Sequence, residues 1–349
     1  MKKAYNIRIN DLEKILNLLK EYDHDLIVDI DILRLDSYIK RLKNSFSESE
    51  ELNLTEKLVS DLEYFPFYKP LYVYSKLFSN TGIKSDLLQK EGKLSTIIIP
   101  DVDVMEHADS FFREQGDFFY SAFLDFKDDA KDHLKFIKPN KMSDGETLML
   151  KSTGEAFVFS PNYSNITKFT ILIHELEHVI DFFNNPDFFD NFVIRETAAV
   201  FMELIACDYI SKKYNLENDN YTRRMWIHHT LKFQAELLND KMKMLNTIYS
   251  SSKSIDTDIF KFLDDHDFEK SYVEYLLEST ISEDFSYQLP YLIAVELYFI
   301  YKNDKKVALN ILIDIIMNAN NENIVYILNK YNIKPNLNIN RYEKLLLKK

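Results

Sequence analysis

The sequence is poor in cysteine, glycine and proline. Its 349 residues include one cysteine, five glycines and eight prolines. A single cysteine excludes an internal disulfide and favours a reducing compartment such as the cytoplasm. Because glycine and proline interrupt helices, their scarcity leaves long leucine, isoleucine and lysine patterns that predict a mainly helical protein.

Basic charge and long apolar runs are also lacking. The net charge of −13 argues against a nucleic-acid partner, since phosphate binding needs an excess of lysine and arginine. No apolar run approaches the roughly 20 residues that cross a membrane. Residues 1–11 lack the apolar core of a signal peptide, so we expect a cytoplasmic protein with no membrane partner. The sequence does not fix the oligomeric state.

The chain divides into two predicted regions. Residues 1–92 read as an N-terminal helical region, with helices expected at 9–22 and 32–46. Residues 93–349 carry the remaining motifs. Three β-branched runs, 94–100, 147–151 and 155–160, predict short strands. The expected fold class is therefore mainly α, with a small β-sheet beside the helix described next.

The segment His174-Glu175-Leu176-Glu177-His178 has the pattern H-E-x-x-H inside an apolar stretch. On a helix, residues four apart share a face, so the imidazoles of His174 and His178 can bind one zinc ion. Glu175 then lies beside the metal, where it can act on a bound water. The apolar flanks predict a buried helix, in which histidines and carboxylates need partners.

A third metal ligand is expected on a second helix within residues 191–209. Glu196 and Glu203 lie seven residues apart there, close to two helical turns, so both carboxylates face the same way. The polar segment 184–190 predicts a turn that packs the second helix against the first. One glutamate can bind the metal while the other accepts an N–H from a ligating histidine. The spacing alone leaves both assignments open.

These residues resemble the thimet oligopeptidase and oligoendopeptidase F family of zinc peptidases, which are zincin-type (gluzincin) enzymes. The resemblance covers roughly residues 145–335. In that family 24 residues separate the second histidine from the glutamate ligand, and here residues 179–202 separate His178 from Glu203. The resemblance implies that Glu203 is the ligand and Glu196 the outer carboxylate, so Glu203→Ala would abolish zinc retention and Glu196→Ala would weaken it. The alternative is a thermolysin-like layout with Glu196 as ligand.

A second stretch, residues 283–298, is similar to the family's tyrosine-bearing segment. The resemblance implies that Tyr287 and Tyr291 donate hydrogen bonds to the oxyanion of the reaction intermediate, a role that is worth about 2.7–4 kcal/mol for one donor in acyl transfer. In a chain with 22 tyrosines, aromatic packing is the other interpretation of both residues.

Three departures from the family pattern stand out. Glu177 replaces the family's glycine, no glycine follows Gly154, and the chain is much shorter than the usual family member. The missing glycine loop reduces the scope for loop closure over a substrate. These departures motivate an alternative function, a metal-containing peptide-binding protein with weakened catalysis.

The expected function is zinc-dependent hydrolysis of peptide bonds in short peptides, with one Zn²⁺ per chain and Glu175 as general base. By the same resemblance, the strand before the metal helix pairs with an extended peptide substrate by strand addition. That role falls on five consecutive residues, Ala156, Phe157, Val158, Phe159 and Ser160. An interior strand of a small sheet is the alternative interpretation.

Overall fold

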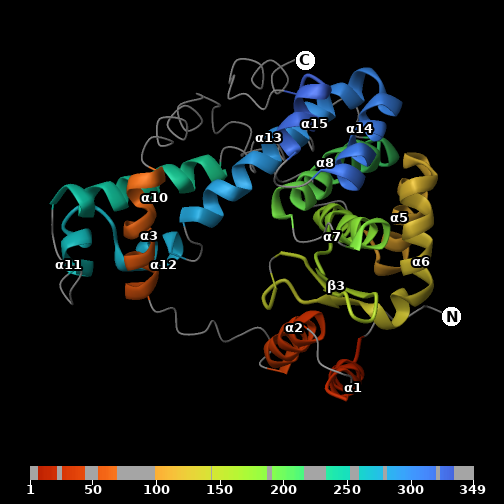
Figure 1. Cartoon of the computed structure of the whole chain (residues 1–349), viewed down its shortest axis with the longest axis horizontal. Helices are drawn as coiled ribbons and strands as arrows, with labels where there is room; N and C mark the ends of the chain where they lie inside the picture. The colour runs from red at the N-terminus through yellow and green to blue at the C-terminus, as the bar shows by residue number, and fades with distance from the viewer. Residues whose placement is uncertain are drawn as a thin grey trace.

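The protein is mainly helical and contains a three-stranded sheet, as the sequence predicted (Figure 1). The computed structural model describes residues 7–21, 26–43, 54–68, 99–142, 144–186, 191–215, 233–251, 259–277, 281–319 and 323–333. None of the helices in these ranges is long and apolar enough to cross a membrane.

The sheet consists of β1 (Leu134–Ile137), β2 (Glu146–Leu150) and β3 (Glu155–Pro161), in the order β1-β3-β2. β3 pairs parallel with β1 and antiparallel with β2. The predicted strands at 147–151 and 155–160 are confirmed as β2 and β3, whereas β1 was not predicted. Of the third predicted strand, 94–98 lie outside the described residues, and Ile99 and Pro100 lead into a helix.

The central place of β3 bears on the predicted substrate strand. Val158, Phe159 and Ser160 are paired with β1 on one side, and β2 pairs with residues 155–159 on the other. The carbonyl oxygen of Ala156 also lies 3.0 Å from His133 Nδ1. Because Val158 and Phe159 are paired on both sides, the structure favours the interior-strand interpretation, and the substrate-binding role of Ala156, Phe157, Val158, Phe159 and Ser160 stays a prediction.

The two faces of the sheet bury different helices. Alternate side chains such as Met149 and Val158 join the main core beneath α7 (Thr167–Asn184), whereas Leu148 and Phe157 pack with α1 (Ile9–Leu19) and α2 (Leu26–Lys43). Asp31 on α2 accepts hydrogen bonds from the backbone N–H and hydroxyl of Ser152, after β2. The N-terminal helices therefore form the outer layer of the sheet.

The main core lies around α7 and α8 (Phe192–Lys213), which pack against each other. Further helices cover this pair on its other sides: α5 (Asp101–Gln115), α6 (Asp117–His133), α13 (Ile281–Asn303), α14 (Lys305–Asn318) and α15 (Ile324–Lys330). Figure 1 shows α5 and α6 on one flank and α14 and α15 above α8. The metal-motif helix thus packs against α5, α6, α8 and the sheet.

A second lobe lies apart from this body (Figure 1). It consists of α3 (Leu54–Tyr68), α10 (Phe233–Ser251), α11 (Ile259–Asp264) and α12 (Lys270–Leu276). α13 begins in this lobe at Ile281 and runs into the main core from Leu292 onward. The predicted N-terminal region thus contributes α1 and α2 to one lobe and α3 to the other, and a boundary at residue 92 stays a prediction.

Candidate metal centre

The motif helix α7 is buried along most of its length, including polar residues. The Asn165 side chain accepts the N–H of Thr167, where the helix begins. Leu172, Ile173 and Leu176 pack into the main core. The observed bounds 167–184 match the predicted apolar stretch.

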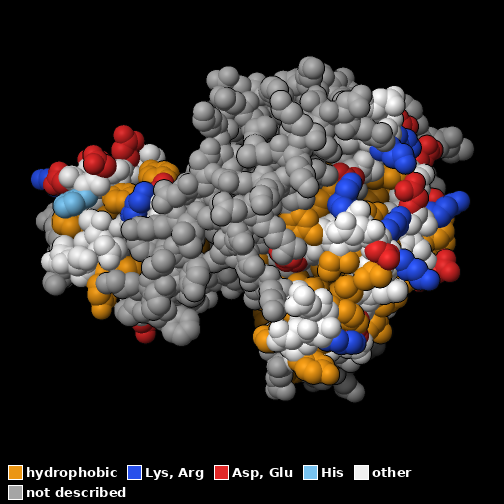
Figure 2. Space-filling model, turned by 90° about the horizontal axis from the view of Figure 1, so that it is seen from above, with side chains coloured by type: hydrophobic (Ala, Val, Ile, Leu, Met, Phe, Trp, Pro, Cys, Tyr) orange, Lys and Arg blue, Asp and Glu red, His pale blue; other side chains and the backbone are white. Residues whose placement is uncertain are grey.

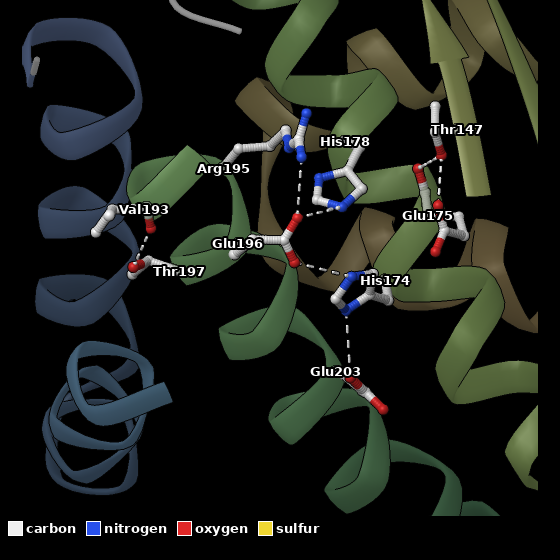
Figure 3. Close-up of polar contacts among 9 residues, drawn as sticks. All are labelled: Thr147, His174, Glu175, His178, Val193, Arg195, Glu196, Thr197 and Glu203. Carbon is white, nitrogen blue, oxygen red and sulfur yellow. Dashed lines mark hydrogen bonds and ion pairs between the residues drawn. The ribbon is translucent and has the colours of Figure 1, made fainter. Parts of the chain in front are cut away.

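The second helix, α8, returns against α7 as predicted. Asn191 precedes it and accepts the N–H of Ile194 at 3.3 Å. Both glutamates of α8 point toward α7, which confirms that they share a face (Figure 3). This face also meets His174 and His178, so the four predicted metal-site residues are brought together.

Glu196 lies between the two imidazoles. Its Oε2 is 3.5 Å from His174 Nε2 and its Oε1 is 3.6 Å from His178 Nε2. One ligand atom from each of these three residues lies within 4.8 Å of the others. Two ligands about 2.1 Å from a tetrahedral zinc ion are separated by about 3.4 Å, so this spacing fits a shared metal. The donor set of two nitrogens and one carboxylate oxygen also suits zinc.

Glu203 approaches the other nitrogen of His174. Its Oε2 lies 3.3 Å from His174 Nδ1. A carboxylate in this position normally orients a ligating histidine and is not itself a ligand. The side-chain arrangement therefore favours Glu196 as ligand and Glu203 as outer carboxylate, whereas the family resemblance implies the opposite roles.

Glu175 occupies the side of α7 that faces β2, away from the α8 side where the imidazoles lie (Figure 3). Thr147 on β2 donates its hydroxyl to Glu175 Oε2 at 2.7 Å. The side chain is buried, and this burial raises the pKa of Glu175 to about 7. A carboxylate with such a pKa can take up and release a proton near neutral pH.

Burial and charge shift the pKa values of the candidate metal ligands in opposite directions. Burial lowers the pKa of His178 well below its usual value. It acts in the same direction on His174, but the contacts with Glu196 and Glu203 prevail and raise the pKa of His174 well above normal. Burial would raise the pKa of Glu196, yet the two histidines bring it down to about 2. A proton is thus held at His174 between carboxylates, in a position that a divalent cation can take over.

Two further carboxylates are buried on α7. Glu177, which replaces the family glycine, is fully buried, and neither of its carboxylate oxygens has a hydrogen-bond partner among the described residues. Asp181 lies one turn further along and is also buried. Burial raises the pKa of both groups well above their usual values. Arg195 Nη2 lies 3.2 Å from Glu196 Oε1. This guanidinium adds a positive charge at one end of the seam, by which we mean the interface between α7 and α8.

The two tyrosine candidates both lie on α13. Tyr291 is partly buried and packs against the main core. The side chain of Tyr287 is outside the described residues. Their role as oxyanion donors stays a prediction.

Sequence reasoning missed three residues near the site: Thr147, Gly145 and Arg195. The chain has only five glycines, and Gly145 is one of them. Because glycine is scarce here, its presence at this position could have indicated a place where another group approaches the backbone closely. No sequence signal identified Thr147, because its contact with Glu175 joins residues 28 positions apart.

The fold is similar to that of several solved structures. No protein-family model and no curated protein matches the sequence. Among solved structures, a protein named oligoendopeptidase F from Bacillus anthracis strain Ames aligns with 97% of this chain, at a TM-score of 0.52 and 12% identity. Another named oligoendopeptidase F aligns with 97% at 0.55 and 10%, and PZ peptidase A with an inhibitor aligns with 94% at 0.54 and 11%.

The predicted resemblance to oligoendopeptidase F is therefore confirmed at the level of the fold. The chain spans 64%, 66% and 63% of the lengths of these three proteins. The chain thus shares the oligoendopeptidase-like architecture of these structures at low sequence identity.

Proposed function

We propose that this protein is a zinc-dependent peptidase that hydrolyses peptide bonds in short peptides. The observation that carries the proposal is the convergence of His174, His178 and Glu196 within 4.8 Å, with Glu175 on the same helix. Proteins with this fold include named peptidases. Peptide hydrolysis needs an activated water, a polarised carbonyl and a proton acceptor, and these residues can provide for all three.

The chain's own residues have distinct tasks in this reaction. A zinc ion bound to the two histidines and one α8 glutamate would supply Lewis acidity and lower the pKa of a bound water toward about 7. Glu175 accepts the proton of the attacking water and passes it to the leaving amine. The α8 glutamate that does not bind the ion holds His174 in orientation. Tyr287 and Tyr291 stay the proposed donors to the oxyanion.

The substrate would lie along β2 instead of β3. β2 is one of the two edge strands of the described sheet, and Thr147 links it directly to Glu175. An extended peptide paired with such an edge presents its backbone beside the catalytic carboxylate. Acidic and basic side chains are interspersed on the described part of one face (Figure 2).

Two measurements on the full-length chain test the proposal. Zinc content is determined on the purified protein, and cleavage of a quenched peptide mixture is compared between wild type and Glu175→Gln. We expect one zinc per chain in both, and cleavage by the wild type alone. Zinc-loaded wild type that cleaves no peptide would favour the alternative, a metal-containing peptide-binding protein, which the buried Glu177 motivates. Failure to bind zinc would defeat both functions.

A further inference from the structure

We propose that Thr147 and Gly145, both near the start of β2, are positioning residues for Glu175. The inference rests on the proposed function, because it takes Glu175 as the general base. It adds two residues outside the metal motif that determine where the base lies.

Thr147 makes a specific contact with the carboxylate of Glu175. Its hydroxyl donates to Oε2 at 2.7 Å, the length typical of a strong O–H···O bond to a charged acceptor. The same hydroxyl lies 3.1 Å from the backbone carbonyl oxygen of Glu175. The two contacts attach the hydroxyl to both ends of one residue, so rotation of the Glu175 side chain would break the shorter bond.

Gly145 provides the space that this orientation needs. A Cβ added at Gly145 would lie 2.6 Å from Glu175 Cδ and still closer to its Cγ and Oε1. All three atoms belong to the catalytic side chain itself. The φ angle of Gly145 is not among the positive values of the described glycines, so the requirement is for space and not for an unusual backbone conformation. Any side chain here would push the carboxylate away from its observed place.

Two features of this segment place the carboxylate. Thr147 holds Oε2 by a hydrogen bond, and the absence of a side chain at Gly145 leaves free the space that Cγ and Oε1 occupy. A general base works only within hydrogen-bond reach of the proton that it takes, so a fixed carboxylate raises the fraction of productive encounters. Because both residues lie at the proposed substrate edge, one segment sets the positions of peptide and base together.

A set of threonine variants tests the role of the hydroxyl. Thr147→Val removes the hydroxyl and preserves the shape, while Thr147→Ser restores it. We expect Thr147→Val to lower kcat by about 10- to 100-fold with KM within about twofold, and Thr147→Ser to stay within about threefold of wild type. Thr197→Val is the matched control, since its hydroxyl also donates at 2.7 Å but to the backbone carbonyl of Val193 in its own helix (Figure 3). Zinc content and melting temperature are measured for every variant.

Wild-type kcat in Thr147→Val would overturn the proposal. So would a Thr147→Ser variant as slow as Thr147→Val when both bind zinc and melt like the wild type. A control Thr197→Val that loses as much kcat as Thr147→Val would assign the loss to general disturbance of the core and also overturn it.

Crystal structures of Thr147→Val and Gly145→Ala give a readout that does not depend on activity. We expect the Glu175 carboxylate to leave its wild-type position in both variants, while His174 and His178 stay in place. An unmoved carboxylate in both would overturn the positioning role. If wild-type enzyme with zinc cleaves no peptide, the proposed function fails, whereas the crystal structures still decide whether Thr147 and Gly145 place Glu175.

Discussion

The two lobes of the molecule bury charge in opposite ways. In the second lobe, Asp61 on α3 and Lys241 on α10 are almost fully buried, and the Lys241 ammonium lies 3.7 Å from the Asp61 carboxylate. The backbone N–H of Ile281, the first residue of α13, donates to the same carboxylate at 2.8 Å. Opposite charges and a donor thus meet at the junction of three helices.

At the seam between α7 and α8, buried acceptors gather instead. Glu196 and Glu203 both approach His174, and Glu177 is buried on the same helix with neither oxygen bonded among the described residues. Burial of the Glu177 carboxyl without a hydrogen-bond partner among the described residues costs stability. The Asp61–Lys241 pair therefore balances its own charges, whereas the excess of carboxyl groups between α7 and α8 is an arrangement that suits a bound cation.

The largest expected effect is the loss of zinc when one glutamate of the seam is removed. Removing the true third ligand abolishes zinc retention, while removing the outer carboxylate weakens affinity by about 10- to 100-fold. From the distances to the two Nε2 atoms, we expect Glu196→Ala to abolish retention and Glu203→Ala to weaken it. Zinc per chain after dialysis against a graded chelator measures the ranking. The reverse ranking would restore the assignment that the family resemblance implies.

The next effect separates chemistry from metal binding in the same seam. Glu175→Gln removes the proton acceptor but keeps the size and the bond from Thr147, so we expect kcat to fall by about 10²- to 10⁴-fold with zinc retained. Cleavage of a quenched peptide and zinc analysis of the same sample measure both. Glu177→Gln, a matched change on the same helix, should retain most activity. Equal losses in the two variants would contradict the role of Glu175.

Sequence reasoning was strongest where helical periodicity decides the outcome. The presence of α7 and α8 and the shared face of Glu196 and Glu203 followed from apolar patterns and a seven-residue spacing, although α8 extends to Lys213, beyond the predicted range 191–209. Periodicity could not decide which glutamate meets the metal. That choice depends on the offset between two packed helices and on side-chain rotamers, which a spacing of two turns does not specify.

The central place of β3 in the sheet could not be predicted from the sequence, for a related reason. β3 looks like a free strand in sequence because its partner β1 is only four residues long and follows α6 without a glycine or proline. Pairing between residues about 24 positions apart, as from Leu134 to Val158, is not visible in local patterns. The contact from Thr147 to Glu175 is non-local in the same way. Long-range pairing therefore set the limit of the sequence-based prediction.

A third prediction tests the contribution of the buried ion pair to the stability of the second lobe. Asp61→Ala removes the negative charge beside the buried Lys241 ammonium. We therefore expect the stability of that lobe to fall by about 3–5 kcal/mol. Hydrogen–deuterium exchange of α3 and α10 locates the effect, and zinc content should stay at the wild-type value. The double variant Asp61→Leu/Lys241→Met should recover most of the stability, because it removes both charges together. Unchanged exchange in Asp61→Ala would show that the pair is not a structural element.

The smallest expected effect concerns the stability of the protein and a buried ammonium, that of Lys168. Lys168 on α7 is buried with its ammonium 4.7 Å from the centre of the Phe136 ring, and burial lowers the pKa of Lys168 to about 8. Below pH 8 the lysine is protonated in both states, so the full burial penalty is present. Between pH 8 and about 10.5 the folded protein has released the proton while the unfolded chain still binds it, so stability rises with pH.

We therefore expect Lys168→Met to be more stable than the wild type by about 1–3 kcal/mol at pH 7, with the difference shrinking as pH approaches 10.5. Denaturant unfolding at pH 7, 8.5 and 10 measures this trend. Lys14→Met, at an exposed lysine on α1, is the control and should show no such trend. A constant difference across the three pH values would mean that the Lys168 ammonium is not penalised by burial. The start of α7 would then accommodate a buried ammonium without a loss of stability. In that case the difference between the two lobes would depend only on the buried carboxyl groups of the seam.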